Sequence, residues 1–130
     1  MISTIYTVHH IFCAYDGKEG RCIACALVNN VSNNSGLYIM LFGVQNLNQG
    51  RGIGTRLLEN IIQWARQTGY RFICLHVHVE NYQAMGLYEK VGFRKTEYIP
   101  NYYGHLPKNP PHAFRMDLPL WSYHGSYLEL

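Results

Sequence analysis

The sequence predicts an α/β (α+β) domain built on a mixed β-sheet. A β-rich run, Leu37–Val44, leads through a glycine-rich turn into a strongly amphipathic helix from Gly52 to Thr68. A second β-rich run, Phe72–Val79, follows that helix, which is the pattern of a crossover between two parallel strands. Short strands joined by turns lie on both sides of this unit and predict antiparallel neighbours.

The segments before the glycine turn predict a hairpin and a third strand. Ile11–Tyr15 and Cys22–Val28 read as strands on either side of a turn at 16–20. Asn29–Gly36 is predicted to be a polar loop that leads into Leu37–Val44. Alternation along this third strand predicts one face made by three side chains: Tyr38, Met40 and Phe42.

The segments after the first helix continue the alternation of strands and helices. Asn81 is a suitable N-cap for a second helix over Tyr82–Val91, and Gly92 is a natural stop. Two more strands are predicted at Phe93–Ile99 and Ala113–Leu118, joined by a loop rich in tyrosine and proline. We therefore expect one domain at 11–118, a short segment at 1–10 and a tail at 119–130.

The composition excludes several classes of protein. The 130 residues are 48% apolar and 15% charged, so the chain can form a modest core and is not a disordered segment. The net charge of +3 is too weak to indicate a nucleic-acid partner but suits an anionic cofactor. No apolar run reaches the roughly 18 residues of a membrane span, and the start does not resemble a signal peptide, so we expect a cytoplasmic protein.

The four cysteines, at 13, 22, 25 and 74, include one CxxC pair. A zinc site would need a second pair at ligand spacing, which Cys13 and Cys74 do not supply. In a regular strand, Cys22 and Cys25 would also face opposite sides of the sheet. We therefore predict no metal and four buried, free thiols.

The glycine-rich turn Gln49–Thr55 predicts an anion site. The first amides of a helix have no partner within the helix, and glycines allow a phosphate to approach the backbone closely. The turn is not a Walker loop, because no Lys-Ser/Thr pair follows its last glycine. Its glycines at 50, 52 and 54 also lack the spacing of the dinucleotide-binding motif.

Two motifs together resemble the GCN5-related N-acetyltransferases, the GNAT family. The first is Gln49-x-x-Gly52-x-Gly54, which is similar to the acetyl-CoA loop of that family. The second begins at Asn81 and continues with Ala84, Tyr88 and Gly92-Phe93, which is similar to the second cofactor segment. The strand from Leu37 to Met40, Leu75-His76-Val77 and Asn101-Tyr102-Tyr103 resemble catalytic subunits of Nα-terminal acetyltransferases of the NatE and NatF types. The similarity covers about residues 10–118.

The resemblance implies a GNAT-like mixed sheet with a central parallel strand pair, and acetyl-CoA as cosubstrate. Its pyrophosphate would lie on the turn, its pantetheine arm along the end of the third strand, and its thioester near Asn81 and Tyr88. The implied cofactor residues are Phe42, Gly43, Val44, Gln49, Gly50, Arg51, Gly52, Ile53, Gly54, Thr55, Asn81 and Tyr88.

The resemblance also implies a catalytic group of Tyr38, His76 and Tyr88. Tyr38 and His76 would hold a water and remove the proton from an α-amine, and Tyr88 would protonate the departing thiolate. Met40, Tyr102 and Tyr103 would contact the first substrate residue. The aromatic walls that the two tyrosines form favour Met followed by a large or hydrophobic residue. Protein N-termini or nascent peptides are therefore the expected substrates.

The chain departs from this family before Ile11, where the usual strand-helix-helix unit would stand. We expect this unit to be missing, which leaves the first strand as an exposed edge and favours association with another acetyltransferase subunit or a second copy. A truncated isoform, a misplaced gene start and a partner that completes the groove are the three explanations. NatF-type relatives also lie on cytosolic membrane faces, which is the alternative to a freely cytoplasmic protein.

Three functions remain open from the sequence. The first is an Nα-acetyltransferase, and the second is an acetyltransferase acting on lysine side chains or small amines. The third is an inactive acetyl-CoA-binding regulatory subunit. For individual residues, Asn81 can be only a helix cap, Tyr88 only a core residue, and His78 either a wall residue or a hydrogen-bonded, half-buried histidine.

Overall fold

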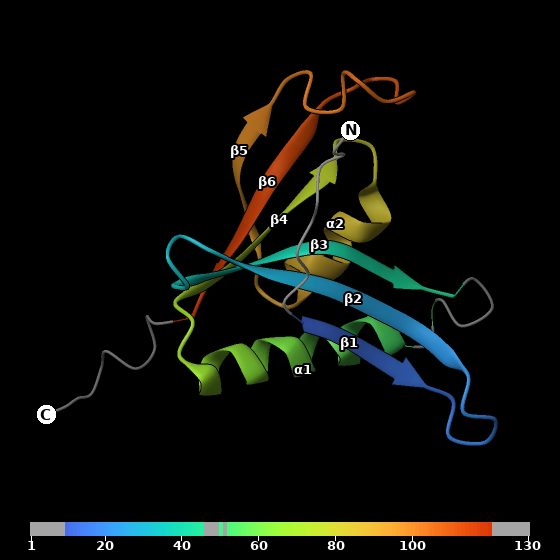
Figure 1. Cartoon of the computed structure of the whole chain (residues 1–130). Helices are drawn as coiled ribbons and strands as arrows, with labels where there is room; N and C mark the ends of the chain where they lie inside the picture. The colour runs from blue at the N-terminus through green and yellow to red at the C-terminus, as the bar shows by residue number, and fades with distance from the viewer. Residues whose placement is uncertain (1–9, 46–49, 51, 121–130) are drawn as a thin grey trace, which may run out of the picture.

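A six-stranded mixed sheet with two helices makes up the computed structural model, which describes residues 10–45, 50 and 52–120 (Figure 1). The strands are β1 (His10–Tyr15), β2 (Cys22–Val31), β3 (Gly36–Val44), β4 (Phe72–His78), β5 (Arg94–Ile99) and β6 (Ala113–Pro119). The helices are α1 (Ile53–Thr68) and α2 (Tyr82–Lys90). The order of these described strands is β1-β2-β3-β4-β6-β5, and among them only the pair β3–β4 is parallel. The predicted fold class and the predicted parallel pair are therefore confirmed.

The largest difference from the predicted elements lies between β2 and β3. β2 runs on to Val31, so the polar loop shortens to residues 32–35. Ser32, Asn33 and Asn34 all have positive φ angles, and Asn tolerates this conformation better than most residues. A chain reversal by left-handed residues explains why the strands extend further than the polar composition predicted.

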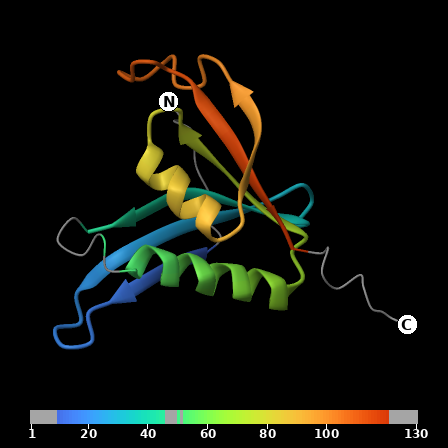
Figure 2. The same ribbon diagram turned by 180° about the vertical axis from the view of Figure 1, so that it is seen from behind.

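Both helices pack on the same side of the sheet (Figure 2). The apolar stripe of α1 is buried, including Leu58, Ile61 and Ala65, and it covers small residues of β2 such as Ala26. Each fully buried methylene contributes about 0.8 kcal/mol, so this layer is the main source of stability. The opposite face of the sheet carries polar groups at its centre, and these include two of the predicted catalytic residues, Tyr38 and His76.

A bulge in β3 changes which side chains share a face. Leu41 pairs with Leu27 but Ile39 pairs with Val28, so Met40 is an extra residue. Beyond this bulge, Phe42 packs against the core while Leu41 is 52% exposed. The prediction that Phe42 shares a face with Tyr38 is therefore wrong, because the bulge interrupts the alternation.

β3 and β4 are paired only over a short stretch. Their register runs from Gly36 opposite Phe72 to Tyr38 opposite Cys74, and the two strands then diverge (Figures 1 and 2). The divergence leaves the backbone of the second half of β3 without β4 as a partner.

The prediction of four buried thiols is wrong for three cysteines. Cys74 is buried, but Cys13 and Cys25 are only half-buried and Cys22 is exposed. Cys13 and Cys25 lie on the face of β1 and β2 that points away from the helices. In the part of the chain that the structure describes, no element covers this face. Cys13 lies directly opposite Cys25, with 3.9 Å between the sulfur atoms.

β1 forms an edge of the sheet in the described residues, as predicted. Ile11 and Tyr15 on this strand are each 62% exposed. Neither described helix is both long and apolar enough to cross a membrane.

Candidate active site

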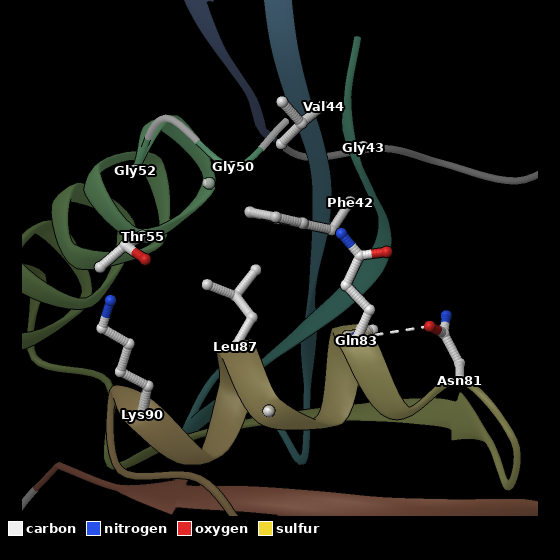
Figure 3. Close-up of a pocket in the computed structure, with 13 residues that line it drawn as sticks. Phe42, Gly43, Val44, Gly50, Gly52, Thr55, Asn81, Gln83, Leu87 and Lys90 are labelled. Carbon is white, nitrogen blue, oxygen red and sulfur yellow. Dashed lines mark hydrogen bonds between the residues drawn. The ribbon is translucent and has the colours of Figure 1, made fainter. Parts of the chain in front are cut away.

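The first part of the candidate site is a cavity of about 500 Å³ between the ends of β3, α1 and α2 (Figure 3). It is lined by thirteen residues: Phe42, Gly43, Val44, Gly50, Gly52, Gly54, Thr55, Asn81, Gln83, Ala84, Gly86, Leu87 and Lys90. The cavity thus brings together eight of the residues that the sequence assigned to the cofactor. Whether these residues bind a cofactor remains a prediction.

The start of α1 contributes backbone to this cavity. Gly52, the N-cap, has φ +77°, and Gly50 has φ +80°, a conformation that other residues adopt only with strain. Among the residues that the structure describes, no side chain caps this helix, and no acidic residue lies in its first turn. The free amides and the positive end of the helix dipole therefore face the cavity without a competing anion from α1 itself.

Gly54 is required by close packing. A Cβ atom built on Gly54 would lie 3.3 Å from both the Leu87 and the Val44 side chains. The glycine therefore lets α1 approach α2 and β3, which sets the width of the cavity.

α2 supplies the opposite wall and a positive charge. The Asn81 side chain accepts a hydrogen bond from the Ala84 amide at 3.2 Å, so the predicted N-cap is confirmed. Lys90 extends from the last turn of α2 toward the start of α1, where Thr55 lies (Figure 3). Gln83, Gly86, Leu87 and Lys90 were not predicted, because a helical stripe that lines a cavity is not distinguishable from a solvent-exposed one by sequence pattern.

Four predicted cofactor residues lie elsewhere or outside the described chain. Ile53 lines a second, smaller cavity between β1 and α1. Tyr88 is only 7% exposed and contacts the rings of Phe42 and Phe93. Gln49 and Arg51 are outside the described residues.

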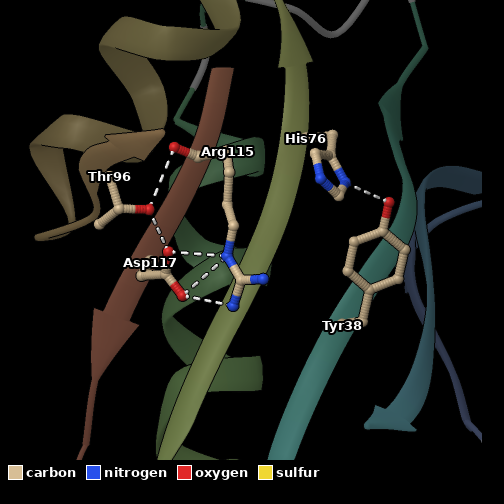
Figure 4. Close-up of polar contacts among 5 residues, drawn as sticks. All are labelled: Tyr38, His76, Thr96, Arg115 and Asp117. Atoms are coloured by element: carbon tan, nitrogen blue, oxygen red, sulfur yellow. Dashed lines mark hydrogen bonds and ion pairs between the residues drawn. The ribbon is translucent and has the colours of Figure 1, made fainter. Parts of the chain in front are cut away.

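The second part of the candidate site is a polar cluster on the sheet face opposite the helices. The Tyr38 hydroxyl lies 2.8 Å from Nδ1 of His76 (Figure 4), and the Tyr102 hydroxyl lies 3.2 Å from the same nitrogen. The Tyr102 ring stacks on His76 with 4.4 Å between centroids and 21° between planes. The structure therefore brings three predicted site residues together around one imidazole nitrogen.

Burial determines the protonation of this cluster at neutral pH. Burial raises the pKa of Tyr38, and its contact with Tyr102 acts in the same direction. Burial lowers the pKa of His76, and the Arg115 charge adds to this effect, although Glu97 and Asp117 oppose it. His76 is therefore neutral, and a single lone pair on an acceptor Nδ1 takes a proton from one of the two hydroxyls at a time.

An ion pair lies beside the cluster, and the sequence reasoning missed it. Arg115 lies opposite His76 in the β4–β6 ladder, and its guanidinium contacts the Asp117 carboxylate at 2.9 Å (Figure 4). Thr96 on β5 also donates to Asp117. Burial opposes ionisation of Asp117, but these hydrogen bonds lower its pKa overall, so the pair stays charged. An alternating Arg-x-Asp on a predicted strand could have indicated this pair.

The remaining predicted residues flank these two parts. Met40 is the bulged residue of β3, two positions beyond Tyr38. The Tyr103 ring meets the Tyr102 ring edge-on at 4.9 Å. Burial raises the pKa of Tyr88 to about 12. Among the described residues, no group of three or more His, Cys, Asp or Glu side chains could hold a metal ion.

Comparison with known proteins identifies the family model that fits the chain. Residues 4–93 match the model described as the acetyltransferase (GNAT) family. The N-alpha-acetyltransferase 50 of Danio rerio is 32% identical over 95 residues, which cover 72% of this chain and 56% of the relative. The chain spans about half the length of the curated relatives it matches.

Two solved structures extend the comparison. The structure titled NatC complex bound to Gag peptide and CoA is 30% identical, with TM-score 0.73, and the match covers 85% of this chain and 70% of that one. Naa50 of Arabidopsis thaliana, in complex with the bisubstrate analogue CoA-Ac-MVNAL, is 28% identical with TM-score 0.66. That match covers 75% of this chain and 66% of that one.

Proposed function

Since this chain belongs to the acetyltransferase (GNAT) family, we propose that it transfers an acetyl group from acetyl-CoA to the α-amino group of protein N-termini. The observation that carries this proposal is the contact of Tyr38 and Tyr102 with His76, on the strand that diverges from β3 beside the cavity. The relatives named as N-alpha-acetyltransferases support the same activity.

The cavity fits the cosubstrate in its chemistry. A pyrophosphate needs several N–H donors and a positive field, and the start of α1 and Lys90 offer both. The half of β3 that has diverged from β4, which includes Phe42 and Gly43, offers peptide groups to an amide-bearing chain such as pantetheine. Acetyl-CoA, when bound, supplies the acetyl group as an activated thioester.

Tyr38 and His76 would remove the proton from the amine. The pKa of an α-amine is about 8, so a weak base is sufficient. The direct contact at 2.8 Å places the phenol against the imidazole, so a proton received at the Tyr38 oxygen can be passed to Nδ1 as the phenol donates its own. The resemblance implied a water held by these two residues, and in this geometry such a water would contact the outer side of the phenol.

Tyr88 would stabilise the departing thiolate by a hydrogen bond. Its pKa of about 12 keeps the hydroxyl protonated, but a thiol has a pKa of about 8.5. Complete proton transfer from Tyr88 to the thiolate would therefore be uphill. Donation without full transfer is the role that agrees with this difference.

The substrate class follows from the walls beside His76. Tyr102 and Tyr103 offer aromatic surface, and Met40 offers a flexible apolar side chain. These residues favour a first residue such as Met, followed by a large or hydrophobic residue. A peptide beginning with Met-Val is part of the analogue bound to Arabidopsis Naa50. Cytoplasmic location and a partner subunit remain predictions.

Steady-state acetylation of a peptide beginning with Met-Leu tests the proposal. The wild-type chain should acetylate the free N-terminus, and His76→Ala should reduce kcat by about 10²-fold or more, the range of general-base catalysis. Tyr38→Phe should cause a smaller loss because Tyr102 still contacts Nδ1. Equal rates for the wild type and both variants would refute the assigned roles.

A matched peptide with a blocked N-terminus and one lysine tests the alternative substrates. We expect no transfer to this peptide. The pKa of a lysine amine is about 10.4, so its deprotonation needs a stronger base than neutral His76. Tight CoA binding with no transfer to either peptide would instead indicate a regulatory subunit.

A further inference from the structure

The loop between β5 and β6 carries Tyr102 onto His76. This loop, residues 100–112, closes on itself through a hydrogen bond from the Tyr103 amide to the Pro111 carbonyl at 2.7 Å. Asn101 adopts a left-handed conformation, φ +61°, at the first limb. The position of Tyr102 therefore depends on how this loop is attached to the sheet.

His78 attaches the returning limb of the loop to β4. Its Nε2–H donates to the Pro110 carbonyl, and its Nδ1 accepts from the Glu80 amide at 3.2 Å. The two bonds require a neutral ring with the proton on Nε2, and they use both ring nitrogens. His78 lies on the same strand as His76, two residues further along, so the two side chains share a face.

A continuous row of aromatic rings joins His78 to the polar cluster. The centroids of His78 and Tyr103 are 5.8 Å apart, those of Tyr103 and Tyr102 are 4.9 Å apart, and those of Tyr102 and His76 are 4.4 Å apart. The His78 ring therefore contacts the loop twice, once through the Tyr103 ring and once through the Pro110 carbonyl. Both contacts hold the loop against β4 beside His76.

His112 makes a second attachment at the base of the loop. Its Nδ1 accepts from the Asn101 amide at 2.9 Å, and its carbonyl accepts from the Val79 amide at 3.2 Å. His112 fixes where the two limbs leave the sheet, while His78 holds the returning limb further out. Loss of His78 would release the outer part of the loop without opening its base.

We propose that His78 is a positioning residue, which holds the loop so that Tyr102 stays on His76 and the aromatic wall faces the peptide. This inference rests on the proposed function for its effect on acetylation but not for its effect on the loop. His78 does not line the cofactor cavity, so its loss should affect the peptide and spare acetyl-CoA.

A pair of amide substitutions isolates the bond to Pro110. In His78→Gln the side-chain nitrogen takes the place of Nε2 and can still donate to the carbonyl. In His78→Asn the amide is shorter and takes the place of Nδ1, so the bond to Pro110 is lost. We expect His78→Asn to raise the KM of the Met-Leu peptide about tenfold, with the KM of acetyl-CoA within twofold of wild type. His78→Gln should restore most of the peptide KM.

Limited trypsin digestion gives a second readout that needs no acetylation. Cleavage after the exposed Lys108 in the same loop should be about tenfold faster in His78→Asn than in wild type or His78→Gln. His105→Ala, a change of an exposed histidine in the same loop, serves as the control and should behave as wild type in both assays.

Two results would overturn the inference. One is equal cleavage of the wild type, His78→Gln and His78→Asn after Lys108, and the other is a rise in the KM of acetyl-CoA equal to that of the peptide. A wild-type chain that transfers no acetyl group would refute the proposed function, and the digestion would still decide the role of His78.

Discussion

Asn81 can act as a helix cap, as a ligand for the cosubstrate, or as both, and its replacement distinguishes these roles. The Asn81→Ala change removes the oxygen that accepts the Ala84 amide at 3.2 Å. Loss of an Asn cap costs about 1 kcal/mol. With an unfolding entropy of roughly 2 cal/mol/K per residue, a chain of this length should lose roughly 4 °C in Tm. Thermal denaturation followed by circular dichroism measures this shift.

The Asn81→Ser variant keeps a capping oxygen but loses the carboxamide N–H₂ at the rim of the cavity. We expect Asn81→Ser to recover the wild-type Tm and yet bind CoA about three- to tenfold more weakly, the value of one lost hydrogen bond. Isothermal titration calorimetry gives the affinity. Recovery of wild-type CoA affinity in Asn81→Ser would show that Asn81 is a cap alone and would refute its role as a ligand.

Three further predictions concern packing, pH and charge. Gly54→Val should lower the free energy of unfolding, measured in urea, by about 1–3 kcal/mol, because even a Cβ atom added at this position would lie 3.3 Å from Leu87 and Val44. Gly86→Ala is the control and should not destabilise the fold, because a Cβ atom at Gly86 meets nothing within 4 Å. Burial lowers the pKa of His76 in the folded state. The contribution of neutral His76 to stability is therefore present above about pH 6.5 and is lost as the pH falls below that value. The Tm of the wild type should fall more than the Tm of His76→Asn between pH 8 and pH 5. Lys90→Gln should weaken CoA binding about fivefold at low salt and reduce its salt dependence, and an unchanged salt dependence would contradict the assignment of Lys90 to the phosphates.

Local patterns made the elements and half of the site predictable. The apolar stripe at Leu57, Ile61 and Ala65 predicted α1, and Asn81 predicted the start of α2; the structure confirms both. Tyr38 and His76 could be brought together because one crossover makes their strands parallel neighbours. Residues in the two strands then meet at a register that the sequence limits to a few choices.

Features set by tertiary contacts were not predictable. The bulge at Met40 arises from the pairing of β3 with β2, and it redirects Phe42 toward the core. Arg115 comes to lie beside His76 because β6 pairs with β4, and His78 gains its partner, the Pro110 carbonyl, from the loop between β5 and β6. No periodicity within one segment indicates such partners, because the contacts depend on strand order and on the path of the loop.

The central claim is that His76 and its tyrosines act on a peptide α-amine. The most direct test is one peptide that begins with Met-Leu, has a free N-terminus and contains an internal lysine. It is incubated with acetyl-CoA and the wild-type chain, with His76→Ala as the control. Tandem mass spectrometry locates the acetyl group. We predict acetylation of the N-terminal amine alone, strongly reduced in His76→Ala, whereas acetylation of the lysine, or an undiminished rate in the variant, would contradict the account.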